Sequence, residues 1–115
     1  MRVFVYWNLH KNLWSVKAME GENKGRVINH VRGLALKDAT FKVSRAGRER
    51  VLREQRKNVH AGVAGEVLQG EDFFGRTQVT YNPYKYSTFV KKDSPEEVIR
   101  YAPKVCFYSD RTVFI

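Results

Sequence analysis

Cysteine, proline and long apolar runs are all scarce in this 115-residue sequence. The single cysteine, Cys106, excludes a disulfide within the chain and is typical of a reducing compartment. Lying between Val105 and Phe107, it is expected to be a small, buried, apolar residue. No stretch approaches the roughly 20 apolar residues that cross a bilayer, and the first residues lack the pattern of a secretory signal. We therefore expect one intracellular domain covering residues 1–115, with no membrane contact.

Metal-ligating and catalytic patterns are also missing. His10, His30 and His60 are scattered, without the HxxH or CxxC spacing of metal sites, and the sequence has no glycine-rich phosphate loop. We expect no metal, no cofactor and no catalytic residue, so the protein is predicted not to be an enzyme. One alternative stays open, a metal-free nuclease in which His10, His60 and lysines serve as general acid and base.

What the sequence has in excess is positive charge. Lys and Arg number 21 and Asp and Glu 12, which leaves a net charge of +9. Such an excess raises the local concentration of anions, including nucleic acid, free nucleotides and acidic protein surfaces. The charge predicts an anionic partner and does not choose among these three classes.

Alternating apolar residues predict a mostly antiparallel sheet. Residues 3–7 and 13–18 read as a β-hairpin, and the chain ends in a second hairpin, 105–108 with 112–115. Further strands are expected at residues 26–31, 34–36, 39–43, 59–68 and 77–81.

Two helices are expected to complete an α+β fold. Ser44 can cap a long basic helix that runs from Arg45 to about residue 57. Ser94 and Pro95, followed by two glutamates, predict the start of a short C-terminal helix that ends near Pro103. The expected class is therefore α+β, a mostly antiparallel sheet with one long basic helix and one short C-terminal helix.

The long basic helix and a nearby aromatic cluster are the two candidate binding features. The helix carries six basic residues against two acidic ones and too little apolar surface for a normal core-facing stripe. One face should stay exposed, contact a ligand or meet another subunit, which favours a homo-oligomer. Aromatic residues interleaved with Arg76 and Lys85 could fill the sheet core or stack on nucleobases. These aromatic residues are Phe73, Phe74, Tyr81, Tyr84, Tyr86 and Phe89.

Several ordered strings together resemble a family of small phage-encoded proteins, the first-described phage anti-Thoeris family. The strings are NLHKN (8–12), WSVK (14–17), LKDATFKVS (36–44), VLRE (51–54), RKNVHA (56–61) and VTYNPY (79–84). The resemblance implies an oligomeric sponge that sequesters cyclic ADP-ribose-type immune signals in the host cell cytoplasm without degrading them. It also implies that a second site can hold cyclic oligonucleotides.

The resemblance implies two sets of site residues, in pockets between protomers. Residues that suit the cyclic nucleotide pocket are Arg56, Asn58, Phe73, Phe74, Asn82 and Arg111. Gly25, Arg26 and Ala102 suit the second site. Arginine forks match a pyrophosphate and an aromatic face matches adenine, so the residue types agree with such a ligand.

Two other functions use the same ingredients and stay open. The chain could bind nucleic acid, or it could be a basic inhibitor that docks on an acidic host protein. Binding of polymeric nucleic acid should weaken steeply with salt, whereas binding of a small enclosed ligand should respond far less.

Overall fold

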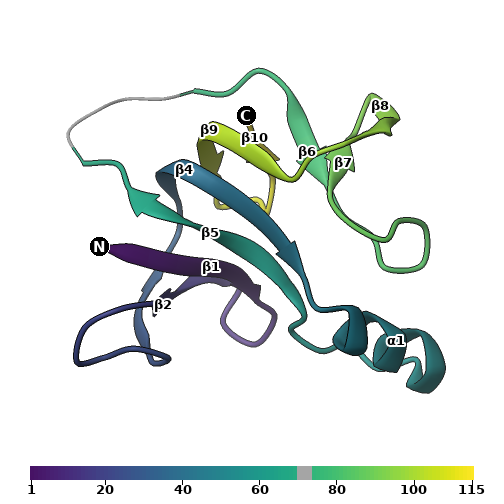
Figure 1. Cartoon of the computed structure of the whole chain (residues 1–115), viewed down its shortest axis with the longest axis horizontal. Helices are drawn as coiled ribbons and strands as arrows, with labels where there is room; N and C mark the ends of the chain where they lie inside the picture. Colours follow the sequence, from purple (N-terminus) through teal and green to yellow (C-terminus); the bar gives the residue numbers. More distant parts are fainter. Residues whose placement is uncertain (70–73) are drawn as a thin grey trace.

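Antiparallel strand pairing organises the chain, shown in Figure 1 as a computed structural model that describes residues 1–69 and 74–115. The described strands form one ten-stranded sheet in the order β3-β2-β1-β5-β4-β9-β10-β6-β7-β8. Their bounds are β1 Arg2–Asn8, β2 Leu13–Ala18, β3 Val27–Val31, β4 Leu34–Val43, β5 Ala61–Val67, β6 Gln78–Thr80, β7 Val90–Lys91, β8 Ser94–Val98, β9 Tyr101–Phe107 and β10 Val113–Phe114. One helix, α1 Arg45–Glu54, is present in the described part of the chain.

The two predicted hairpins are confirmed. β1 pairs with β2, with Val5 opposite Val16, and β9 pairs with β10. Val3 and Val5 are almost fully buried, whereas the alternate residues of β1 lie on the other face of the sheet, as the period of two requires. Cys106 is buried in β9, as expected.

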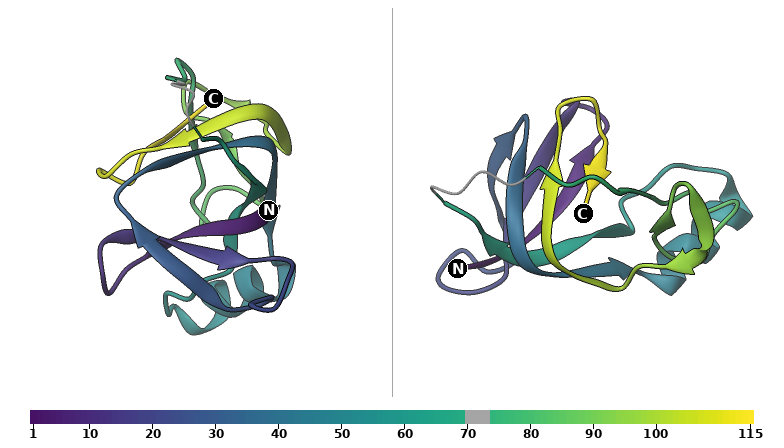
Figure 2. Two further views of the ribbon diagram at one scale, coloured as in Figure 1. Left: turned by 90° about the vertical axis from the view of Figure 1, so that its left-hand side faces the viewer. Right: turned by 90° about the horizontal axis from the view of Figure 1, so that it is seen from above.

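The sheet curves until strands far apart in its order meet (Figure 2). Trp14 of β2 and Phe107 of β9 have ring centroids 4.9 Å apart, although β1, β5 and β4 separate these two strands. The Trp14 indole also donates a hydrogen bond of 2.8 Å to the carbonyl of Tyr108. Apolar residues on the concave side therefore form one core, which includes Leu36, Val63 and Val105.

A bulge in β4 corresponds to the interruption predicted at residues 37–38. The register between β4 and β5 shifts between Lys37 and Thr40, and Asp38 has a positive φ of 49°. One extra residue in β4 increases the local bend of the strand, which contributes to the curvature of the sheet.

The long basic helix is shorter than predicted, because it ends at Glu54 instead of near residue 57. Its N-cap is correct, since the Ser44 hydroxyl accepts a hydrogen bond from the Gly47 N–H. Gln55 adopts the left-handed conformation that terminates the helix. The chain then returns to the sheet, where the Ser44 N–H donates to the His60 carbonyl at 2.7 Å.

The predicted C-terminal helix is wrong. Residues 94–98 form the edge strand β8, and residues 101–107 form β9, which pairs with β4 along most of its length. An edge strand tolerates Pro95 because a missing N–H costs no ladder hydrogen bond on the open side. Pairing of β8 with β7 and of β9 with β4 outweighs the local helix-start signal, so the described part of the fold is mainly β with one short helix.

Among the described residues, no helix is long and apolar enough to cross a membrane.

Candidate functional site

A pocket of about 470 Å³ opens where the chain leaves α1 and where the strand β6 ends. Four segments that are distant in sequence supply its walls: the end of β1, the turn from α1 into β5, the loop after β6 and the turn before β10. Its lining residues are Trp7, Leu9, Val51, Gln55, Lys57, Asn58, Val59, His60, Ala61, Thr80, Tyr81, Asn82, Pro83, Tyr84 and Arg111. We call this hollow the basic pocket, because these lining residues include Lys57 and Arg111 and no carboxylate.

Arg111 reaches the basic pocket from a tight turn. Its φ is +72°, in the left-handed region that residues other than glycine and asparagine seldom adopt. Its N–H donates to the Tyr108 carbonyl at 3.1 Å, and its guanidinium carbon lies 6.0 Å from the Trp7 ring centroid. The pocket thus has a cation held beside an aromatic face.

The neighbouring Asp110 stabilises that turn. Its carboxylate accepts hydrogen bonds from the hydroxyl and the N–H of Thr112. These two bonds favour the charged form and lower the pKa of Asp110 below its ordinary value.

A hydrogen-bonded relay forms another wall. His60 Nδ1 lies 3.1 Å from both the backbone and the side-chain oxygen of Asn58, and these two acceptors require Nδ1 to donate. His60 Nε2 is therefore an acceptor, and the Tyr81 hydroxyl donates to it at 2.7 Å. Burial raises the pKa of Tyr81, and the positive charge of Arg48 partly opposes this.

Hydrogen bonds from Arg48 of α1 hold the loop after β6 in place. Arg48 Nε donates to the carbonyls of Pro83 and Tyr86, both at 3.0 Å. The Asn82 side-chain oxygen accepts from the Tyr84 N–H at 2.9 Å, so the Asn82 amide NH₂ is the group that can donate to a ligand. A half-exposed ring, Tyr84, lies at the pocket rim.

Three of the six residues predicted for the first site, Asn58, Asn82 and Arg111, line the basic pocket together. Arg56 is exposed and does not line it, although its neighbours Gln55 and Lys57 do. The side chain of Phe74 is 72% exposed and also lies outside the pocket lining. Phe73 lies outside the described residues.

The residues predicted for the second site are not brought together by strand pairing. Gly25 and Arg26 belong to the turn between β2 and β3, whereas Ala102 lies in β9 and pairs with Ala39. Three strands separate β2 from β9 in the sheet, and Ala102 is 3% exposed, which leaves it no surface for a ligand.

Sequence reasoning missed Trp7 and Lys57 as pocket residues. Trp7 reads as a core residue of a hairpin, and Lys57 was expected inside the helix. Their role follows from the curvature of the sheet and from the early helix end, which sequence periodicity does not encode.

Comparison with known proteins gives the family. The sequence profile of the Mycobacterium phage L5 gene 82 protein matches residues 1–115. The chain belongs to this phage protein family. The gene 82 protein of Mycobacterium phage L5 is 47% identical over 98 residues, which cover 78% of this chain and 77% of that protein. No solved structure matches the chain.

This gene 82 family member has no cluster of three or more potential metal ligands among the residues that the structure describes. The described lining of its basic pocket instead combines two cations, three amide side chains and aromatic rings. Those groups suit an anionic ligand that also carries a flat ring system.

Proposed function

We propose that this gene 82 family member binds and sequesters a small phosphorylated nucleotide of the cyclic ADP-ribose type in the basic pocket, without degrading it. By removing such a signal in the host cell cytoplasm, the protein would act as an anti-defence sponge. The resemblance to the anti-Thoeris family supports this ligand class, and the residue types of the pocket agree with it.

One observation carries the proposal most directly. Arg111 lines a pocket without a carboxylate among its described residues, together with Asn58 and Asn82, and it does so from a backbone conformation that disfavours arginine. A residue held in a sparsely populated conformation costs on the order of 1 kcal/mol or more, and such residues cluster at functional sites. Because the backbone conformation of this turn disfavours arginine, we infer that the residue is there to supply its guanidinium to the pocket.

The ligand class follows from size and charge. A pocket of about 470 Å³ is within the range of small-molecule sites. Lys57 and Arg111 can together balance the two charges of a pyrophosphate, while Trp7 or Tyr84 offers a face to a base. The amides of Asn58 and Asn82 can bond to ribose or base edges.

Binding and retention are tested together by ligand recovery. The protein is incubated with a cyclic ADP-ribose isomer in stoichiometric amounts and then denatured, and the released ligand is analysed by chromatography. We expect the ligand to return intact and in one-to-one ratio. Repeated conversion into a cleaved product would contradict the proposal, and His60, with its Tyr81 partner, would then be the first residue to test as a general base.

A thermal-shift screen separates the rival functions. A ligand present at 100 times its Kd stabilises the fold by about 2.7 kcal/mol, which raises the unfolding temperature. We expect stabilisation by cyclic nucleotides that changes little with salt. The proposed nucleotide binding would be overturned if only polymeric nucleic acid stabilised the protein, with an effect that falls steeply with salt. Stabilisation only by an acidic protein would overturn it as well.

A further inference from the structure

The convex side of the sheet carries a second hollow, of about 600 Å³, with a different character from the basic pocket. Two aromatic rings of β1, Phe4 and Tyr6, form part of its lining, with Lys17 of β2 and Lys42 of β4. We call these four residues the aromatic platform. The hollow shares Val59 and His60 with the basic pocket, so the two sites are neighbours.

Strand alternation explains why these rings face outward. Val3 and Val5 of β1 occupy the concave core, which directs Phe4 and Tyr6 to the opposite face. The two rings have centroids 6.2 Å apart and planes tilted by 37°. Neither ring is fully buried, so both present a surface to solvent.

Small residues of β5 lie beside the two rings on this face of the sheet. The ring of Phe4 lies across Gly62 of β5, where an added Cβ would come within 2.4 Å of Phe4 Cζ. Ala64, the direct partner of Phe4 on β5, is also small. The absence of bulk at these positions lets the Phe4 ring lie over β5 while it lines the hollow.

The charged side chains in the described lining of this hollow are both lysines. Lys17 of β2 is paired directly opposite Phe4 of β1. Lys42 of β4 is paired opposite Gly62 of β5, the residue over which the Phe4 ring lies. Among the residues that the structure describes, no carboxylate lines the hollow and neither lysine is in an ion pair.

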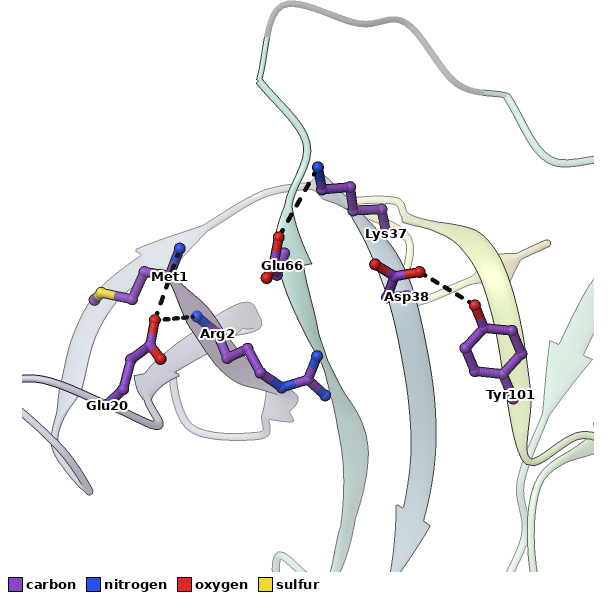
Figure 3. Close-up of polar contacts among 7 residues, drawn as sticks. All are labelled: Met1, Arg2, Glu20, Lys37, Asp38, Glu66 and Tyr101. Atoms are coloured by element: carbon purple, nitrogen blue, oxygen red, sulfur yellow. Dashed lines mark hydrogen bonds and ion pairs between the residues drawn. The ribbon is translucent and has the colours of Figure 1, made fainter.

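Three carboxylates outside the hollow make polar contacts of their own, which Figure 3 shows. Glu66 lies 3.9 Å from Lys37, and Glu20 accepts a hydrogen bond of 3.0 Å from the Arg2 N–H. Asp38 accepts a hydrogen bond from the Tyr101 hydroxyl. None of these three carboxylates lines the hollow, where the charged residues among the described lining are Lys17 and Lys42.

We propose that the aromatic platform binds single-stranded nucleic acid, with bases stacked on Phe4 and Tyr6 and backbone phosphates beside Lys17 and Lys42. Every base has a π-face, so binding should tolerate many sequences. Bases paired inside a duplex cannot reach the rings, so single strands should be preferred. This site adjoins the basic pocket and shares Val59 and His60 with it, but the proposal does not depend on nucleotide binding there.

The test is fluorescence anisotropy with a labelled oligothymidylate of about ten nucleotides. The variant K17Q/K42Q removes both platform charges, and K11Q/K92Q removes two exposed lysines elsewhere as the matched control. For K17Q/K42Q we expect the slope of log affinity against log salt to become shallower by about 1.4, since each lost contact to single-stranded DNA removes about 0.7. The control should keep its slope.

Stacking is tested with F4L and Y6L, which retain apolar bulk and remove the flat ring. Each should weaken oligothymidylate binding by about tenfold or more. Circular dichroism and thermal unfolding establish that each variant folds. If a leucine variant fails to fold, the salt slopes of the lysine variants decide the matter.

Several results would overturn the proposal. These are no oligonucleotide binding by the native protein, equal losses in K17Q/K42Q and K11Q/K92Q, and equal affinity for a duplex. Equal affinity for polyglutamate of matched charge would assign the face to an acidic protein partner instead.

Discussion

At the scale of single residues, Arg111 shows the clearest conflict between folding and function. Its positive φ suits glycine, whereas its guanidinium lies beside Trp7 in the basic pocket. Replacing arginine by glycine relieves about 1 kcal/mol of backbone strain and removes a cation–π contact of about 0.5–1 kcal/mol. We expect the free energy of unfolding of Arg111→Gly to lie within about 1 kcal/mol of that of the native protein.

Arg111→Ala is the matched variant, because it removes the same guanidinium and keeps a Cβ at positive φ. It should be less stable than Arg111→Gly by about 1 kcal/mol. Urea unfolding measures both variants. Equal stability of the two would show that the left-handed conformation is not maintained in solution.

The pH dependence of the same turn follows from Asp110. Thr112 lowers the pKa of this carboxyl in the folded chain, relative to an ordinary value of 3.8. The carboxylate therefore contributes stability that is present above pH 3.8 and is lost as pH falls through the lower, folded pKa. An NMR titration should find the Asp110 midpoint below 3.8, and Thr112→Val should move it back toward that value. An unchanged midpoint in Thr112→Val would contradict the hydrogen-bond explanation.

At the scale of elements, the end of α1 offers a test of how the helix is terminated. Gln55 has a φ of +55° at the C-terminal cap, where glycine is the favoured residue. Gln55→Gly should stabilise the fold by about 0.5–1 kcal/mol, whereas Gln55→Ala should give no such gain. Thermal unfolding of the two variants provides the comparison. A longer helix, seen as increased helical circular dichroism in Gln55→Ala, would mean that the cap does not fix the boundary.

The sequence predicts strands better than helices in this protein. Alternation identified both hairpins, and the interruption at 37–38 marks a bulge in one continuous strand. The helix start at Ser44 was correct because capping is local. The C-terminal helix failed because Pro95 and its glutamates satisfy an edge strand as well as a helix start, and pairing between distant strands decided the outcome.

The candidate site was only partly predictable for a related reason. The sequence predicts Asn58, Asn82 and Arg111 as site residues, but the pocket that joins them exists only because the sheet curves and α1 ends early. The resemblance also implies Arg56, which is exposed and does not line this pocket. The second set stays a prediction, and within one chain Ala102 is a core residue of β9.

At the scale of the whole molecule, the basic helix remains without a full apolar partner. Val51 is its only buried residue, and the chain carries a net charge of +9. We expect a homo-oligomer, in which a second copy covers part of the exposed surface. Light scattering at micromolar concentration should give a mass greater than that of one 115-residue chain. A mass of one chain at every concentration would contradict this.

The central claim is that one defined pocket, and not diffuse positive charge, holds a phosphorylated nucleotide. Titration calorimetry with a cyclic ADP-ribose isomer tests it on the native protein, Arg111→Gly and Arg45→Gln, the last removing an exposed arginine outside the pocket. Loss of a charge-assisted contact should cost Arg111→Gly about 2 kcal/mol, or roughly thirtyfold in affinity, and Arg45→Gln almost nothing. Equal, small losses in both variants, or no binding to the native protein, would contradict the account.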